Sequence, residues 1–330
     1  MLIERGRIPY SIARKLKWDL IIFPDHGPYF REECPKIYVS HGISSGKQIG
    51  GGHYIYGKGS KDSHGNMLYE KIFMHSNLIK EQVRAHYPEF YDCVKIVGSL
   101  TADELLEKSR NFNREEELLK LNLDPSKKTI MIASSWGPYC LIQNQGEELI
   151  EQINRLQDEF NIILSIHLHN FHVENHYEGK NIKVLLERLK KINVYIPVPK
   201  ESTHLLLSYA DVMVTDMTSL GLYYPLLRRP VIFYDNPNIQ YSLSGFIPAM
   251  REIAYRISDV SNLSFDIVKA LEEFNLVVME KLSERIFSYQ GQARERFLEE
   301  IYESLNMEYL RDDSCAPESL IGQRSKEINT

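Results

Sequence analysis

The sequence predicts an α/β protein with two parallel-sheet domains in succession. The chain has 330 residues, more than one ordinary domain needs. Short runs rich in β-branched and aromatic residues alternate with longer helical patterns, which is typical of βαβ units. The polar stretch Glu115–Lys128 separates two such series and contains the turn Asp124-Pro125-Ser126.

Nine short apolar runs are the expected strands. Four precede residue 115, at Leu20–Pro24, Lys36–Ser40, Lys71–His75 and Val94–Gly98. Five follow it, at Thr129–Ser134, Asn161–His167, Asn193–Pro197, Asp211–Thr215 and Val231–Tyr234. We therefore expect an N-terminal acceptor-side domain over residues 1–115 and a C-terminal donor-binding domain over residues 116–310.

Helical patterns fall between these strands in the second series. They lie at about 145–159, 181–191, 202–209 and 218–228, and a long pattern from Phe265 to Leu305 is broken near Gln290-Gly291. Residues 311–330 are polar and aperiodic, and we expect a flexible tail. Two Rossmann-like domains facing a cleft form the glycosyltransferase B architecture, which is the fold we expect.

Charge and cysteine content limit the classes of function. The net charge of −6 argues against general nucleic-acid binding. Residues 1–100 carry a net +4, which suits an anionic partner or a membrane surface but is also an ordinary surface fluctuation. The four cysteines form no Cys-x-x-Cys pair, and no run approaches the roughly 18 apolar residues of a membrane span. We expect a cytoplasmic protein with free thiols.

The first candidate site follows the strand Asp211–Thr215. Asp216, Thr218 and Ser219 come next, and the two hydroxyl residues open a helix. Free N–H groups and the helix dipole favour an anion there. An ordinary N-cap explains Thr218 and Ser219 equally simply.

The second candidate is the pair His167 and His169. The two residues end a strand at positions i and i+2, so both side chains should point to the same side. An imidazole there can contact a phosphate or serve as a structural hydrogen-bonding group. His172 and His176 follow, but without a nearby cysteine or suitably spaced carboxylates they are a weak zinc signal. We expect neither a metal nor a cofactor.

The third candidate is His41-Gly42, at the end of the strand Lys36–Ser40, with a Ser/Gly-rich loop that reaches Lys47. An imidazole can accept a proton from a hydroxyl near neutral pH. An incidental turn explains the same residues. Ser135 and Trp136 follow the strand Thr129–Ser134, where they line a nucleotide cleft or pack between the domains.

Together these segments resemble the CDP-glycerol glycerophosphotransferases of teichoic-acid and capsule synthesis, over about residues 19–240. Five motifs carry the resemblance in order: His41-Gly42 with Lys47, Val97-Gly98-Ser99 with Asp103, Ser135-Trp136-Gly137-Pro138, His167-Leu168-His169-Asn170, and Thr215-Asp216-Met217-Thr218-Ser219. Some positions depart from the family pattern. His167 replaces a Lys, Asn170 replaces a Pro, Lys47 lies one residue late, and Tyr223 occupies the place of an acidic residue.

The resemblance implies a transferase in which an acceptor hydroxyl attacks the outer phosphorus of a CDP-alditol and CMP leaves. His41 would be the base, and His169 the second catalytic residue. The donor would bind Gly42, Lys47, Ser135, Trp136, His167, Thr215, Asp216, Thr218 and Ser219. The acceptor would be an anionic or lipid-linked glycan or polyol phosphate, reached by peripheral contact with the inner face of the membrane.

Three other functions are consistent with the same residues. One is a sugar transferase of the same fold that uses a CMP-sugar or another nucleotide-sugar. Another is a nucleotide-sugar 2-epimerase, although no convincing set of acid/base carboxylates is present. The last is a non-catalytic nucleotide-binding protein. Little sequence precedes the first strand, so we also expect a short N-terminal domain compared with relatives.

Overall fold

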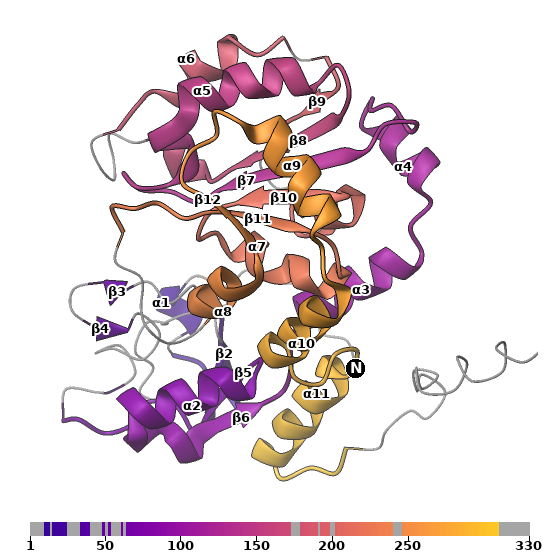
Figure 1. Ribbon diagram of the computed structural model, residues 1–330. Helices are drawn as coiled ribbons and strands as arrows, with labels where there is room; N and C mark the ends of the chain where they lie inside the picture. The colour runs from indigo at the N-terminus through magenta and orange to yellow at the C-terminus, as the bar shows by residue number, and fades with distance from the viewer. Residues whose placement is uncertain are drawn as a thin grey trace, which may run out of the picture.

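The computed structural model contains two parallel sheets, one above the other (Figure 1). It describes residues 10–13, 15–24, 34–39, 48–49, 52–53, 61, 64–172, 179–190, 192–198, 202–239 and 246–309. The six-stranded sheet lies in the upper part of Figure 1 with α5 and α6 over it, and the smaller sheet lies below with α2 and α11.

The N-terminal sheet has four parallel strands in the order β1-β2-β5-β6. Their bounds are Ile21–Phe23, Lys36–Val39, Lys71–Met74 and Val94–Ile96. These agree with the four predicted strands to within two residues. The central strand β5 is fully buried, as parallel strands covered on both faces are. A short antiparallel pair, β3 (Gln48–Ile49) and β4 (Gly52–His53), lies outside this sheet.

The C-terminal sheet has six parallel strands in the order β12-β11-β10-β7-β8-β9. Their bounds, from β7 to β12, are Thr129–Ser134, Asn161–Ile166, Val194–Tyr195, Val212–Thr215, Val231–Tyr234 and Tyr255–Ile257. Counted within this sheet, the order is 3-2-1-4-5-6 reversed, the doubly wound arrangement. The direction in which strands are added to the sheet reverses between β7 and β10, and ligands bind such sheets at the carboxyl ends of the strands beside this switch point.

Helices cover both sheets. The α-helices with their bounds are α1 Tyr10–Ala13, α2 Asn77–His86, α3 Leu100–Arg110, α4 Arg114–Lys120, α5 Leu141–Leu156, α6 Ile182–Glu187, α7 Ser219–Tyr223, α8 Phe246–Ile253, α9 Leu263–Glu272, α10 Leu276–Ile286 and α11 Ala293–Ser304. The 3-10 turns are η2 Pro88–Cys93, η3 Leu168–Phe171, η5 Leu205–Tyr209 and η6 Tyr224–Leu227. The long pattern from Phe265 to Leu305 is therefore three helices, with the expected break near Gln290-Gly291 and a second break after Glu272.

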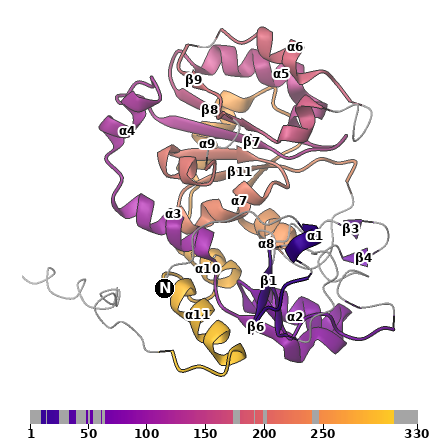
Figure 2. The same ribbon diagram turned by 180° about the vertical axis from the view of Figure 1, so that it is seen from behind.

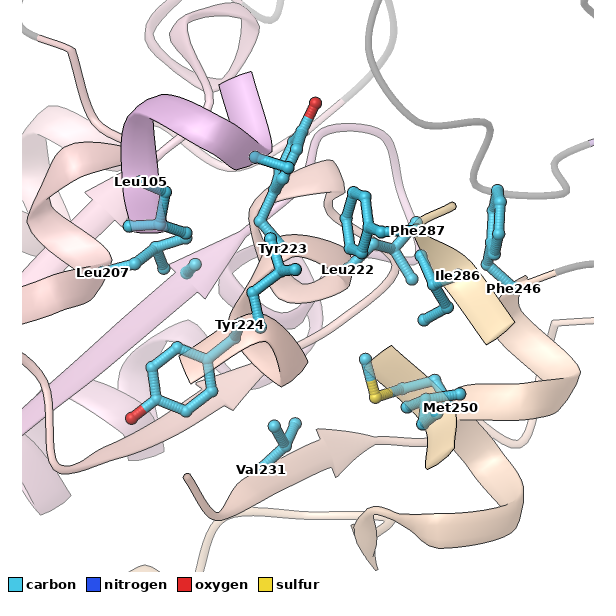
Figure 3. Close-up of a cluster of buried hydrophobic side chains, with 14 of the residues drawn as sticks. Leu105, Leu207, Leu222, Tyr223, Tyr224, Val231, Phe246, Met250, Ile286 and Phe287 are labelled. Carbon is cyan, nitrogen blue, oxygen red and sulfur yellow. The ribbon is translucent and has the colours of Figure 1, made fainter. Parts of the chain in front are cut away.

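Two connections join the sheets. Figure 2 shows α3 and α4 running along one side from the lower sheet to the upper. The chain returns after α10, and α11 packs on the N-terminal sheet, where the Lys71 ammonium lies 2.8 Å from carboxylate oxygens of both Glu300 and Glu303. The rings of Phe73 and Phe297 pack edge to face, with centroids 4.8 Å apart. One apolar core continues through the seam between the sheets, with side chains from α3, α7, α8 and α10 in contact (Figure 3).

Candidate functional site

The candidate site lies where β7 and β10 end side by side. The two strands pair in parallel, with Ala133 opposite Thr215 at their carboxyl ends. Ser135 and Trp136 therefore leave the sheet at the same edge as Asp216 and the segment that follows it. The polar residues predicted from two distant parts of the chain are brought together at the switch point.

The Asp216 carboxylate connects the two sides of this point. It is 3% exposed and accepts hydrogen bonds from the backbone N–H groups of Ser135 and Leu141, each at 2.8 Å. The Ser134 hydroxyl donates to it at 3.1 Å. Burial raises the pKa of the Asp216 carboxyl, and these hydrogen bonds act in the opposite direction. Asp216 thus holds the loop between β7 and α5 in place, and its oxygens face that loop.

The loop from Ser135 to Cys140 has further supports. Gly137 has a φ of +105°, a conformation that side chains other than glycine rarely adopt. The buried Asn236, just after β11, donates from its amide to the Tyr139 carbonyl at 2.9 Å. Asn144 in α5 donates to the Pro138 carbonyl at 2.7 Å. The loop is therefore preorganised by neighbours on two other elements.

His167 and His169 lie together, but not as alternating strand residues. The strand β8 ends at Ile166, and His167 is the N-cap of the 3-10 turn η3. Its Nδ1 accepts a hydrogen bond from the His169 N–H at 3.2 Å, and the two rings are 4.8 Å apart. The predicted extension of the strand to His167 was wrong because this local hydrogen bond turns the chain.

Trp136 packs against both imidazoles. Its ring lies 5.0 Å from that of His169 in an edge-to-face arrangement and 6.0 Å from that of His167. The indole is 36% exposed. Trp136, His167 and His169 therefore form one aromatic group at the carboxyl ends of β7 and β8.

Asn170, which departs from the family pattern, joins the candidate site through buried hydrogen bonds. It is 1% exposed, and its amide donates to the Ser135 carbonyl at 2.7 Å. Its Oδ1 accepts from Gln143 Nε2 at 3.4 Å. Asn170 thus fastens η3, and with it His169, to the Ser135 loop. The one signal in the sequence was its place directly after His169.

The Thr215–Ser219 segment combines buried and accessible hydroxyls. Thr215 is fully buried, and its hydroxyl donates to the Asp216 carbonyl at 3.2 Å. Thr218 is the N-cap of α7, and its Oγ1 accepts from the Leu220 N–H at 3.4 Å. Ser219 begins α7 and is exposed. Thr218 therefore has the capping role that the sequence allowed, and Ser219 presents a hydroxyl to solvent.

The exposed groups at this edge are hydrogen-bonding and aromatic. His167, Trp136 and Ser219 are accessible, while the carboxylate of Asp216 is turned inward. Imidazole and hydroxyl groups can contact phosphate oxygens, and an indole can lie against a flat base or a sugar. Across the described residues, no three His, Cys, Asp or Glu side chains are grouped so that they could hold a metal ion.

One further family motif, Val97-Gly98-Ser99 with Asp103, takes part in the seam between the sheets, as does Tyr223. The Asp103 carboxylate accepts hydrogen bonds from the N–H groups of Gly291 at 2.6 Å and Ala293 at 2.8 Å, at the start of α11. Gly98, with a φ of +86°, allows the close approach of Ala293, because an added Cβ would lie 3.1 Å from the Ala293 Cβ. Tyr223, at the place of the acidic residue, is 6% exposed and stacks on Phe287. The remaining predicted residues, His41, Gly42 and Lys47, lie outside the described part of the chain, as does His26.

Solved structures with the same architecture include wall teichoic acid enzymes. The wall teichoic acid polymerase TagF matches with a TM-score of 0.67 and 14% identity, covering 92% of this chain and 76% of the polymerase chain. A variant of TagF soaked for 30 minutes with CDPG matches with a TM-score of 0.65 and 15% identity, covering 92% and 76%. The S. aureus MnaA–UDP structure matches with a TM-score of 0.57 and 15% identity, covering 90% and 79%. At these identities the similarity establishes the fold, and it confirms the glycosyltransferase B architecture.

Comparison of sequences gives the family. No curated protein sequence is significantly similar to the chain. The family model described as CDP-Glycerol:Poly(glycerophosphate) glycerophosphotransferase matches residues 30–303, which include both sheets' core strands from β2 onward and the whole described site. The chain therefore belongs to the CDP-glycerol:poly(glycerophosphate) glycerophosphotransferase family.

Proposed function

We propose that this protein binds CDP-glycerol, or a closely related CDP-alditol, at the switch point between β7 and β10 and transfers its glycerol phosphate to an acceptor hydroxyl. Family membership makes the chain a glycerophosphotransferase. The observation that supports this location most strongly is the single hydrogen-bonded unit formed by Asp216, the Ser135 loop and η3. A rigid polar edge at a topological switch point is where doubly wound sheets bind nucleotides.

We assign different parts of the donor to different residues of the described site. His169 and the Ser219 hydroxyl are the groups we assign to the diphosphate. Trp136 and His167 pack against His169 and are assigned to the nucleotide. Asp216, Thr215 and Asn170 are buried and hydrogen-bonded to the surrounding loops, so they position the binding groups. Fixed donors of this kind stabilise charge on a leaving nucleotide without having to reorganise during the reaction.

The transfer forms one P–O bond and breaks another. The acceptor oxygen attacks the outer phosphorus of the donor, and the bond from that phosphorus to the bridging oxygen breaks. The bridging oxygen leaves on CMP, and the proton of the acceptor hydroxyl passes to a base, which we assign to His41. Phosphoryl transfer depends mainly on positioning and on charge stabilisation, so few reactive side chains are required.

The acceptor we propose is an anionic or lipid-linked polyol phosphate at the inner face of the membrane. None of the helices in the described residues is both long and apolar enough to span a bilayer. Contact would be peripheral, and the net charge of +4 over residues 1–100 supports attraction to an anionic surface. Such an attraction weakens as added salt screens it, so sedimentation with anionic vesicles should fall as ionic strength rises.

Calorimetry with matched nucleotides tests the donor assignment. CDP-glycerol, CDP and CMP should bind more tightly than UDP and UDP-sugars, and His169→Ala should weaken the binding of CDP more than that of cytidine. Equal affinity for cytidine and uridine nucleotides would contradict the donor assignment. Tight binding of a UDP-sugar with its turnover would favour a sugar transferase or an epimerase.

A further inference from the structure

Tyr223 joins the donor-side helix α7 to the opposite half of the molecule. It is the last residue of α7, whose first residue is Ser219. Its ring stacks on Phe287 with centroids 5.5 Å apart and an angle of 28°. Phe287 directly follows α10, where the chain leaves the C-terminal half to return to the N-terminal sheet. Figure 3 shows the two rings side by side in the seam.

The hydroxyl of Tyr223 reaches the N-terminal half. Burial raises the pKa of Tyr223, and the neighbouring hydroxyl groups of Ser99 and Thr101, at the start of α3 after the N-terminal strand β6, act on it in the opposite direction. In Figure 3 this hydroxyl points away from that of the neighbouring Tyr224. The Tyr224 hydroxyl instead donates to the Ala210 carbonyl at 3.1 Å, within the C-terminal half.

The start of α3 is also where the returning chain is anchored. Asp103, in the first turn of α3, accepts the N–H groups of Gly291 and Ala293. Ser99 caps the same turn by accepting the Ala102 N–H at 3.2 Å. The first turn of α3 therefore contacts both α7, through Tyr223, and the segment that leads into α11, through Asp103.

The length of α7 makes this contact relevant to the site. An α-helix rises about 1.5 Å per residue, so Tyr223 and Ser219 are separated by about 6 Å along the axis. A short, buried helix moves as a unit, and a shift at Tyr223 therefore becomes a shift of Ser219 and Thr218. The alignment of the donor edge with the N-terminal half then depends on the contacts at Tyr223.

We propose that Tyr223 is a positioning residue that holds α7, and with it Thr218 and Ser219, in register with the N-terminal half. The proposal rests on the proposed function, since the acceptor side is assigned to that half. Loss of the hydroxyl should affect the alignment of donor and acceptor while the donor-binding groups themselves remain. A misplacement of about 1 Å can lower a rate by about 10²-fold.

The test compares Tyr223→Phe with Tyr224→Phe. Both substitutions remove one buried hydroxyl from adjacent tyrosines. The Tyr223 hydroxyl has Ser99 and Thr101 of the N-terminal half as neighbours, whereas the Tyr224 hydroxyl bonds within the C-terminal half. We expect Tyr223→Phe to lower kcat for transfer from CDP-glycerol by about 10- to 100-fold and to leave its KM for the donor within about twofold. Tyr224→Phe should leave kcat close to that of the unmodified protein. Unchanged kcat in Tyr223→Phe, or an equal loss in Tyr224→Phe, would overturn the proposal.

A second readout does not depend on activity. Hydrogen exchange of the N–H groups of Ala102, Gly291 and Ala293 reports on the turn that receives Tyr223. Exchange there should be faster in Tyr223→Phe than in Tyr224→Phe. If the unmodified protein does not turn over CDP-glycerol, the proposed function fails, and these exchange rates alone decide on Tyr223. Equal exchange in the two variants would then reject the positioning role.

Discussion

The carboxylate of Asp216 accepts the backbone N–H of Ser135 at 2.8 Å, across the two strands that flank the switch point. The residues lie 81 positions apart in the sequence, so this bond fixes two loops that local structure alone would not bring into register. The same carboxylate accepts the N–H of Leu141, the first residue of α5. The geometry of the candidate donor site therefore depends on a residue that does not face the solvent.

Substitution of Asp216 by Asn should weaken both stability and donor binding. An amide has one acceptor oxygen in place of two, and its NH2 group would face the N–H groups of Ser135 and Leu141. Hydrogen bonds to a charged group contribute about 1.5–3 kcal/mol each, so a loss of about 3 kcal/mol in the free energy of unfolding is expected. Urea denaturation measures this loss, and calorimetry with CDP measures the affinity. An Asp216→Asn variant with unchanged stability would show that the loop is held by other contacts.

Substitutions of Thr218 and Ser219 should distinguish a helix-capping role from a donor-binding role. Thr218→Ala removes the N-cap of α7 and should lower the free energy of unfolding by about 1 kcal/mol. Ser219→Ala removes an exposed hydroxyl and should leave stability unchanged. It should raise the Kd for CDP-glycerol by about 10-fold or more, because a hydrogen bond to a charged partner contributes about 1.5–3 kcal/mol. Unchanged donor affinity in Ser219→Ala would show that Thr218 and Ser219 have a structural role only.

The buried His75 should make the seam sensitive to acid. It lies directly after β5, is 5% exposed, and packs against Phe246 and Phe287 at ring distances of 5.3 and 6.1 Å. Burial lowers the pKa of His75 from 6.5 to about 3. The unfolded chain therefore binds a proton between these values that the folded chain does not, and stability falls as the pH decreases below about 6.5.

The size of this effect follows from the shift in pKa. At about pH 4.5 the loss attributable to His75 should be about 3 kcal/mol, since one pKa unit corresponds to about 1.4 kcal/mol. His75→Phe removes the titrating group and keeps an aromatic ring in an aromatic site. The unfolding free energies of the two proteins are compared at about pH 7 and about pH 4.5. The difference should shift in favour of the variant at the lower pH. A difference that is independent of pH would contradict the assignment.

His41 should act on rate more than on donor affinity. Loss of a general base costs about 10²–10⁴-fold in rate, and His41→Ala should show a loss of this order with a donor Kd within a few-fold of the unmodified protein. His169→Ala should weaken donor binding as well as rate. His26→Ala is the matched control, because His26 also precedes a glycine after an apolar strand. Loss of turnover in His26→Ala with full activity in His41→Ala would show that the general base is His26 and not His41.

Nine of the ten strands in the two parallel sheets were predicted from the sequence, because buried parallel strands are continuous apolar runs. All six residues of β7 are buried, and its bounds agree with the prediction. The strand β12 was missed because it has only three residues and carries the exposed Arg256. The helix α8 was missed because Pro248 and an apolar composition obscure its period. The helix α4, Arg114–Lys120, overlaps the stretch Glu115–Lys128, which was interpreted as a connection only.

The grouping of the candidate site residues was more predictable than their individual contacts, and their roles stay predictions. Placement after a strand identified Asp216, Ser135 and His169, since the carboxyl ends of parallel strands share one edge. The inward orientation of Asp216 and the locking bond of Asn170 arise from partners 81 and 35 positions away, which no local pattern reveals. The division between residues 1–115 and 116–310 stays a prediction. The helix α11 falls in the second of these ranges but packs on the N-terminal sheet.

The release of CMP tests the central claim most directly. Purified protein is mixed with CDP-glycerol and a poly(glycerol phosphate) acceptor, with a UDP-sugar as an alternative donor, and the nucleotides and acceptor length are measured over time. We predict that CMP appears only when acceptor is present and that one glycerol phosphate is added to the acceptor for each CMP released. Consumption of the UDP-sugar with CDP-glycerol left intact, or binding of CDP-glycerol without any CMP, would contradict the account.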